Sequence, residues 1–109
     1  MEGITCLFRT SNKVPDSWAA YHRQVLLEAI GDTPLITISK KPMDLGTNLI
    51  DTELSSFSNF YFQILRGAKA ATTPYIAIIE DDTLYHASHF IFRPPLDTFA
   101  YNMNRLSLF

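Results

Sequence analysis

The chain has 109 residues, which is the usual length of one domain. Its nine basic and eleven acidic side chains give a net charge of −2, which argues against nucleic acid or an anionic membrane as a partner. Apolar residues make up 47% of the chain, enough to build a buried core. We therefore expect one compact cytoplasmic domain, with neither a signal peptide nor a membrane span.

The chain contains a single cysteine, Cys6. One cysteine excludes an internal disulfide and any metal site built from several thiolates. Cys6 lies in the apolar run Ile-Thr-Cys-Leu-Phe, so we expect its thiol to be buried and unreactive.

Strands and helices are predicted in alternation. Three short apolar runs, many of their residues β-branched, predict strands over residues 4–8, 35–39 and 75–79. The first helix is expected to open at Val14-Pro15-Asp16-Ser17 with a side-chain cap and to end at Gly31. Residues 40–51 are mostly polar and predict a loop.

A second helix is predicted after Ser55 or Ser56, either of which is suited to cap it, and Thr72-Thr73-Pro74 would end it. Its apolar residues fall on one stripe, which is most simply interpreted as core. The members of this stripe are Phe57, Phe60, Tyr61, Ile64, Leu65, Ala68 and Ala71.

This order of elements predicts an α/β fold with a Rossmann-like open, mostly parallel sheet and flanking helices. Such sheets bind ligands at the carboxyl ends of their strands. The residues to examine are therefore 9–12, 40–48 and those from 80 onward.

Three consecutive carboxylates, Glu80-Asp81-Asp82, follow the third predicted strand. If the strand continues, Glu80 and Asp82 project from one face about 7 Å apart. Two such carboxylates suit Mg²⁺ or Mn²⁺ shared with a substrate diphosphate. The alternative is an acidic loop that ends the strand without binding a ligand.

Other polar residues offer weaker signals. His86 and His89 could join Asp82 in a metal site of mixed oxygen and nitrogen ligands, or one could lie on the surface while the other packs beside Phe90. The segment Arg9-Thr10-Ser11-Asn12 offers donors for a ribose, base or phosphate, or makes an ordinary turn. No glycine-rich dinucleotide or phosphate loop is present.

Several segments together resemble a group of bacterial and viral glycosyltransferases with the GT-A fold. In these proteins a strand ends in a variant of the DxD motif, followed by Leu-Tyr, His-Phe and Tyr-Asn-x-Asn elements. The matching segments here are Tyr75-Ile-Ala-Ile-Ile-Glu-Asp-Asp-Thr-Leu-Tyr85, His86-Ala-Ser-His89-Phe90, Tyr101-Asn102-Met-Asn104, Lys41-Pro42-Met-Asp44-Leu-Gly46-Thr-Asn48 and Tyr61-Phe-Gln63-Ile-Leu-Arg66-Gly67.

The resemblance implies a nucleotide-diphosphate sugar as donor and a hydroxyl of an unknown acceptor. It implies a divalent metal, Mn²⁺ or Mg²⁺, at Asp82, with Glu80 assisting directly or through water and His89 a candidate for the metal or donor environment. It also implies cofactor-binding positions at Arg9, Thr10, Ser11 and Asp81. Asp81 stands where these proteins often have histidine.

The same resemblance implies that residues 1–109 correspond to the donor-binding half of such a domain, so no residue is identified as the catalytic base. Two other functions stay open. One is a non-catalytic binding module that self-associates through the apolar run Leu106-Ser107-Leu108-Phe109. The other is a small metal-binding protein that uses Glu80, Asp82, His86 and His89.

Overall fold

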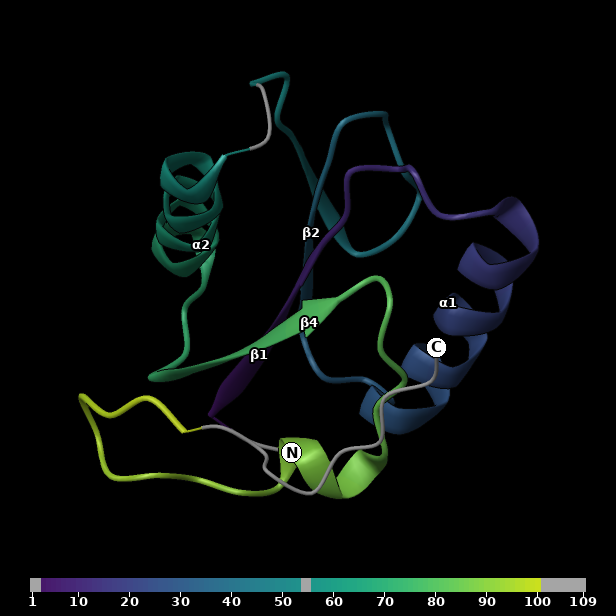
Figure 1. Cartoon of the computed structure of the whole chain (residues 1–109). Helices are drawn as coiled ribbons and strands as arrows, with labels where there is room; N and C mark the ends of the chain where they lie inside the picture. Colours follow the sequence, from purple (N-terminus) through teal and green to yellow (C-terminus); the bar gives the residue numbers. More distant parts are fainter. Residues whose placement is uncertain (1–2, 54–55, 101–109) are drawn as a thin grey trace.

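The computed structural model describes residues 3–53 and 56–100. In chain order its elements are β1 (Ile4–Arg9), α1 (Asp16–Ile30), β2 (Leu35–Ser39), β3 (Thr47–Ile50), α2 (Phe57–Ala70), β4 (Tyr75–Glu80) and the short 3-10 helix η1 (Ala87–Phe90). All four strands run parallel in the order β3-β2-β1-β4. The helices α1 and α2 lie on opposite sides of this sheet (Figure 1). The predicted Rossmann-like α/β fold is confirmed.

The hydrophobic core has two layers, one on each face of the sheet, and alternate side chains of β1 contribute to each. Cys6 and Phe8 pack toward α1, together with Leu26, Ile30 and Phe90. Leu7 packs on the other face with residues of β2 and with Ala71 at the end of α2. This alternation follows from the period of two in a strand, since successive side chains point to opposite faces. Cys6 is fully buried as expected, and burial raises the pKa of its thiol to about 12.

The ends of the helices confirm most of the predicted boundaries. Gly31 ends α1 with a φ of 57°, a left-handed conformation that favours glycine. Ser56 caps α2, because its Oγ accepts a hydrogen bond from the Asn59 backbone N–H at 3.0 Å. The expected side-chain cap on α1 is wrong: Pro15 occupies that position, and no side chain caps the helix.

The segment predicted as a loop over residues 40–51 contains the strand β3. β3 pairs with β2 over four residues and forms one edge of the sheet. Its Thr-Asn-Leu-Ile sequence is polar at its start and leaves Thr47 and Ile50 exposed. The strand was missed because so short and exposed an edge carries neither an apolar run nor a clear alternation.

The apolar stripe of α2 was predicted to be core, and this prediction is wrong for three of its large members, while Phe60 and Ile64 are half-buried. Phe57 is 89% exposed, Tyr61 67% and Leu65 49%. The helix instead buries Gln63 and Gly67 against the sheet. Gly67 lets the helix approach β1 closely, since a Cβ at this position would lie 2.4 Å from Cδ1 of Leu7. The face of α2 that packs on the sheet is therefore set by the close approach at Gly67 and by the polar contacts of Gln63, rather than by the apolar stripe.

β4 is parallel to β1, as predicted, and forms one edge of the sheet, with Ala77 packed on the α1 side and Ile76 on the α2 side. Of its six residues only Ile79 is fully buried. The segment after η1 runs past the amino ends of β1 and β4 (Figure 1), where the Tyr75 hydroxyl donates to the Pro94 carbonyl at 2.7 Å. Among the described residues, no helix is long and apolar enough to cross a membrane.

Candidate functional site

The strand order reverses at β1, because β2 and β3 lie on one side of it and β4 on the other. Open parallel sheets bind ligands at such a reversal, beyond the carboxyl ends of the two strands. Arg9 ends β1 and Glu80 ends β4, and the two residues are direct partners in the ladder. The segments 9–12 and 80–82, singled out separately in the sequence, therefore meet at one point of the sheet.

Side chains from outside β4 hold the backbone of its end. The Trp18 indole Nε1–H donates to the carbonyl of Asp81 at 2.7 Å, and His22 Nε2 lies 2.9 Å from the carbonyl oxygen of Glu80. The Glu80 backbone N–H donates to the Tyr85 hydroxyl at 3.0 Å. Three aromatic side chains thus fix the position of three consecutive peptide units in the acidic turn, as we call Glu80-Asp81-Asp82.

The three carboxylates of this turn differ in their surroundings. Asp81 accepts a hydrogen bond from the Thr10 hydroxyl at 2.6 Å, which ties the turn after β4 to the end of β1. Glu80 and Asp82 are exposed. The strand ends at Glu80, and Asp81 and Asp82 belong to a turn. The condition for a spacing of about 7 Å, a strand that continues to Asp82, is therefore not met.

The histidines proposed as metal ligands lie in different settings. His86 caps η1, since its ring Nδ1 accepts from the Ser88 backbone N–H at 3.1 Å. His89 packs its ring against Tyr85 at 4.9 Å between centroids, and burial lowers its pKa. Within residues 3–53 and 56–100, no three or more His, Cys, Asp or Glu side chains gather into a metal-binding group. His89 and the two exposed carboxylates therefore do not form such a group.

Arg9 is held in place on the α2 side of the sheet. Its Nε–H donates to Oε1 of Gln63 at 2.9 Å, and its guanidinium lies 4.3 Å from the centre of the Phe60 ring. A cation over an aromatic face gains about 0.5–2 kcal/mol, depending on how far it is desolvated. These contacts fix a positive charge at the end of β1, beside the strand that carries Glu80.

Asp51, which follows β3, is the most strongly bound carboxylate at this edge. It accepts hydrogen bonds from the Gln63 amide at 2.5 Å, the Asn59 amide at 2.9 Å and the Glu53 N–H at 3.0 Å. Lys40 lies 3.6 Å away. Burial alone would raise the pKa of Asp51, but these hydrogen bonds and the lysine charge outweigh it and lower the pKa to about 2.

Asn12 joins the first two strands beyond their ends. It has a φ of 59°, and its side-chain oxygen accepts hydrogen bonds from the backbone N–H groups of Lys40 at 2.8 Å and Lys41 at 3.0 Å. Asparagine tolerates this left-handed conformation better than most residues. The polar run 9–12 therefore forms a structured turn, in which Thr10 is buried and Ser11 half-buried.

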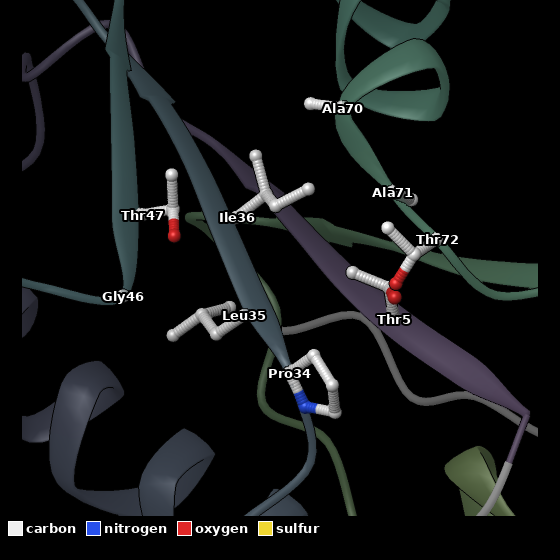
Figure 2. A pocket seen from close by; sticks show the side chains of 9 residues that line it. All are labelled: Thr5, Pro34, Leu35, Ile36, Gly46, Thr47, Ala70, Ala71 and Thr72. Atoms are coloured by element: carbon white, nitrogen blue, oxygen red, sulfur yellow. The ribbon is translucent and has the colours of Figure 1, made fainter.

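One hollow lies at the amino ends of the strands, at the opposite end of the sheet from the acidic turn. It has a volume of about 360 Å³ and is formed by the amino ends of β1, β2 and β3 and by the end of α2 (Figure 2). Its lining residues are apolar or carry only hydroxyls: Thr5, Pro34, Leu35, Ile36, Gly46, Thr47, Ala70, Ala71 and Thr72. No charged side chain lines it, so it offers nothing to a diphosphate or a metal.

A second hollow of about 320 Å³ lies at the carboxyl edge, between the end of β3 and α2. Its lining is polar and includes Asp51, Asn59 and Arg66. The Asp51 carboxylate is already saturated by its internal partners, and Arg66 donates to the carbonyl of Ile50 at 2.7 Å. These contacts join β3 to α2 rather than leaving groups available to a ligand.

The residues that support the acidic turn were not predicted from the sequence. His22 and Trp18 occur on a helix and were indistinguishable from packing residues, because their partners are backbone carbonyls more than fifty positions away. Gln63 was missed because its partners are the side chains of Arg9 and Asp51, which lie on other elements of the fold. The sequence did contain one signal. His22 and Gln63 are polar residues within the two helices, and a polar side chain that becomes buried there needs a hydrogen-bond partner.

Comparison with known proteins gives no further information on this site. No family model matches the chain, and neither a curated protein nor a solved structure matches it.

Proposed function

We propose that this chain binds a nucleotide-diphosphate sugar at the carboxyl edge of β1 and β4, as the donor-binding half of a GT-A-like glycosyltransferase. The observation that carries the proposal is the pairing of Arg9 with Glu80 at the reversal of strand order. A fixed cation and exposed carboxylates there provide two complementary means of binding a diphosphate. The guanidinium attracts phosphate oxygens directly, and the carboxylates attract them through a divalent metal.

Glu80 and Asp82 would hold Mg²⁺ or Mn²⁺. Mg²⁺ usually binds through one or two protein carboxylates and completes its shell with substrate phosphates and water, so a cluster of three protein ligands is not required. When bound, the metal would neutralise the charge that develops on the departing nucleoside diphosphate.

The remaining residues of the site position these groups. Trp18, His22 and Tyr85 fix the backbone of the acidic turn. Thr10 engages the carboxylate of Asp81, which supports Asp81 as a residue that shapes the turn rather than a direct ligand. His89 supports Tyr85 through ring packing. These contacts within the chain support a turn that is preorganised for binding.

Titration calorimetry of the chain with UDP and then GDP, with and without Mn²⁺, tests the proposal. We expect nucleotide binding that requires the metal. Asp82→Asn should weaken it on the order of 10- to 100-fold, the loss seen even for residues that only support metal ligands. The matched control is Asp32→Asn, which removes an exposed carboxylate from the turn between α1 and β2, at the opposite edge of the sheet.

Each of the other outcomes has a definite meaning. Nucleotide binding that is unaffected by Mn²⁺, or that survives Asp82→Asn, contradicts the assignment of the metal site. Metal uptake without any effect of nucleotide favours the alternative of a small metal-binding protein. If a folded chain binds neither the metal nor the nucleotide, the result contradicts the proposal and favours a non-catalytic module.

A further inference from the structure

We propose that Gln63 is a positioning residue, which keeps the guanidinium of Arg9 from forming an ion pair with the carboxylate of Glu80. The inference rests on the proposed function, in which Arg9 meets the phosphates and Glu80 meets the metal. If these two opposite charges paired with each other, both of these roles would be weakened. Gln63 belongs to α2, and its side chain is buried between this helix and the sheet.

Arg9 and Glu80 are neighbours on one face of the sheet. They are ladder partners at the ends of β1 and β4, and paired strands lie about 4.8 Å apart. Ile76 packs on the α2 side of β4, and the alternation of side chains directs Glu80 to the same side. Arg9 also lies on this side, because it contacts Gln63 and Phe60 of α2. Two long side chains of opposite charge in these positions are within reach of each other.

Nevertheless, Arg9 and Glu80 do not form an ion pair. Within residues 3–53 and 56–100, the ion pair at this end of the sheet joins Lys40 to Asp51 at 3.6 Å, and none joins Arg9 to Glu80. Arg9 instead directs its Nε–H to Oε1 of Gln63 at 2.9 Å. A neutral amide has therefore taken the place of the nearest carboxylate as the partner of this cation.

The side-chain amide of Gln63 is suited to this task, because it has one accepting and one donating end. Its Oε1 accepts from Arg9, and its Nε2 donates to Oδ2 of Asp51 at 2.5 Å. The pKa of Asp51 is about 2, so this group is a carboxylate at neutral pH and only accepts hydrogen bonds. Asp51 thus turns the amide so that its oxygen faces the guanidinium. A carboxylate at position 63 could not bridge the two charges, since it has no hydrogen to donate.

Phe60 fixes the plane of the Arg9 guanidinium. The guanidinium carbon lies 4.3 Å from the centre of the Phe60 ring, whose face attracts a cation. With its Nε–H bound by Gln63 and one face covered by Phe60, the guanidinium presents its two terminal nitrogens as a fork. Such a fork binds two phosphate oxygens at once. The same contacts leave the exposed carboxylate of Glu80 available to a metal.

The affinity of the 109-residue chain for Mn²⁺, followed through the fluorescence of Trp18, tests the proposal. Gln63→Met keeps the length of the side chain and removes both hydrogen bonds. We expect it to weaken Mn²⁺ binding about two- to fivefold, the effect of one exposed ion pair, because the released guanidinium neutralises Glu80. In the Arg9→Met background there is no guanidinium to release, so Gln63→Met should have no effect there.

Two further variants control for the fold, which circular dichroism checks in every case. Gln63→Asn retains a buried amide that is one methylene too short to reach both partners, and it should also weaken Mn²⁺ binding. Gln24→Met, on the exposed face of α1, should leave it unchanged. Parental affinity in a folded Gln63→Met chain overturns the proposal. So does an equal loss with and without Arg9, because Gln63 would then have a structural role only.

A second readout needs neither metal nor nucleotide, so it separates this inference from the proposed function. In proton–nitrogen correlation spectra of the metal-free chain, the Nε–H signal of Arg9 is identified by its loss in Arg9→Met. Glu80→Gln should leave this signal in place in the parent chain and shift it in Gln63→Met. An equal response of the signal in both backgrounds overturns the inference. If the parent chain binds no Mn²⁺ but the expected shifts occur, the proposed function fails while the role of Gln63 in positioning Arg9 stands.

Discussion

Nε2 of His22 lies 2.9 Å from the backbone carbonyl oxygen of Glu80, which joins α1 to the end of β4. Because a carbonyl oxygen only accepts hydrogen bonds, Nε2 carries the hydrogen. The imidazole is 2% exposed and stacks on the Phe8 ring at 5.1 Å between centroids. A buried side chain of a helix thus sets the position of the peptide unit from which the acidic turn begins.

Substitution of His22 by phenylalanine should destabilise the chain by about 1–3 kcal/mol, because the ring volume is kept while the Glu80 carbonyl loses its donor. Urea unfolding followed by circular dichroism measures this difference. Gln24→Ala is the control, since Gln24 lies on the exposed face of the same helix. Equal stability of His22→Phe and Gln24→Ala would mean that the hydrogen bond contributes nothing to the turn.

Trp18 is the only tryptophan of the chain and donates to the Asp81 carbonyl, so its emission reports on the acidic turn. Mn²⁺ bound at Glu80 and Asp82 should quench this fluorescence, because the ion is paramagnetic and close to the indole. An excess of Mg²⁺ should restore the emission by displacement. A fluorescence titration measures both effects.

The controls for the Trp18 titration distinguish binding at the turn from collisional quenching. Asp82→Asn should abolish the saturable part of the quenching, while Asp32→Asn should retain it. Quenching that rises linearly with Mn²⁺ in all three proteins would show that no metal binds beside Trp18.

Asp51 should make the stability depend on pH in the acid range. Its pKa is about 2 in the folded chain against 3.8 for an unperturbed aspartate. The folded state therefore binds its proton less readily than the unfolded state. The resulting stabilisation is present above about pH 4 and is lost as the pH falls toward 2. Its size is at most about 2.5 kcal/mol, since one pKa unit corresponds to about 1.4 kcal/mol.

Urea unfolding of the parent chain and of Asp51→Asn at several pH values isolates this contribution. We expect the difference in free energy of unfolding between the two proteins to shrink as the pH falls from 4 to 2. The free energy of unfolding of Asp32→Asn should change with pH in the same way as that of the parent chain. A constant difference between the parent and Asp51→Asn would contradict the lowered pKa.

The alternation of apolar runs with helical periodicity was sufficient to predict β1, β2, β4 and both helices, because each has a pattern of its own. The expected parallel order also placed Arg9 and Glu80 at the same end of the sheet, and the two residues are partners in the ladder. It missed β3, a four-residue edge strand with a polar start. Local periodicity cannot identify a strand whose formation depends on pairing with β2.

The face of α2 shows a second limit of sequence patterns. Periodicity correctly located an apolar stripe, but it could not tell whether the stripe faced the sheet or the solvent. Gln63 decides the orientation, because its amide joins Arg9 and Asp51 beneath the helix. Contacts of this kind, between residues far apart in the chain, are the part of the site that the sequence did not reveal.

Gly67 provides a direct test of the observed orientation of α2. A Cβ at this position would lie 2.4 Å from Cδ1 and 2.7 Å from Cδ2 of Leu7, whose side chain is fully buried. Alanine gains about 1 kcal/mol over glycine in helix propensity, but overpacking of a core costs about 1–3 kcal/mol. We expect Gly67→Ala to destabilise the chain by up to about 2 kcal/mol in urea unfolding, although alanine is the better helix former.

The double variant with Leu7→Ala separates this clash from other effects. Leu7→Ala alone should cost about 2–5 kcal/mol through the cavity that it leaves. In its presence the added methyl of Gly67→Ala enters open space, so the second substitution should become neutral or stabilising. Such coupling is expected only for residues in contact. Strictly additive effects would mean that Gly67 does not face Leu7, and α2 would then present a different face to the sheet.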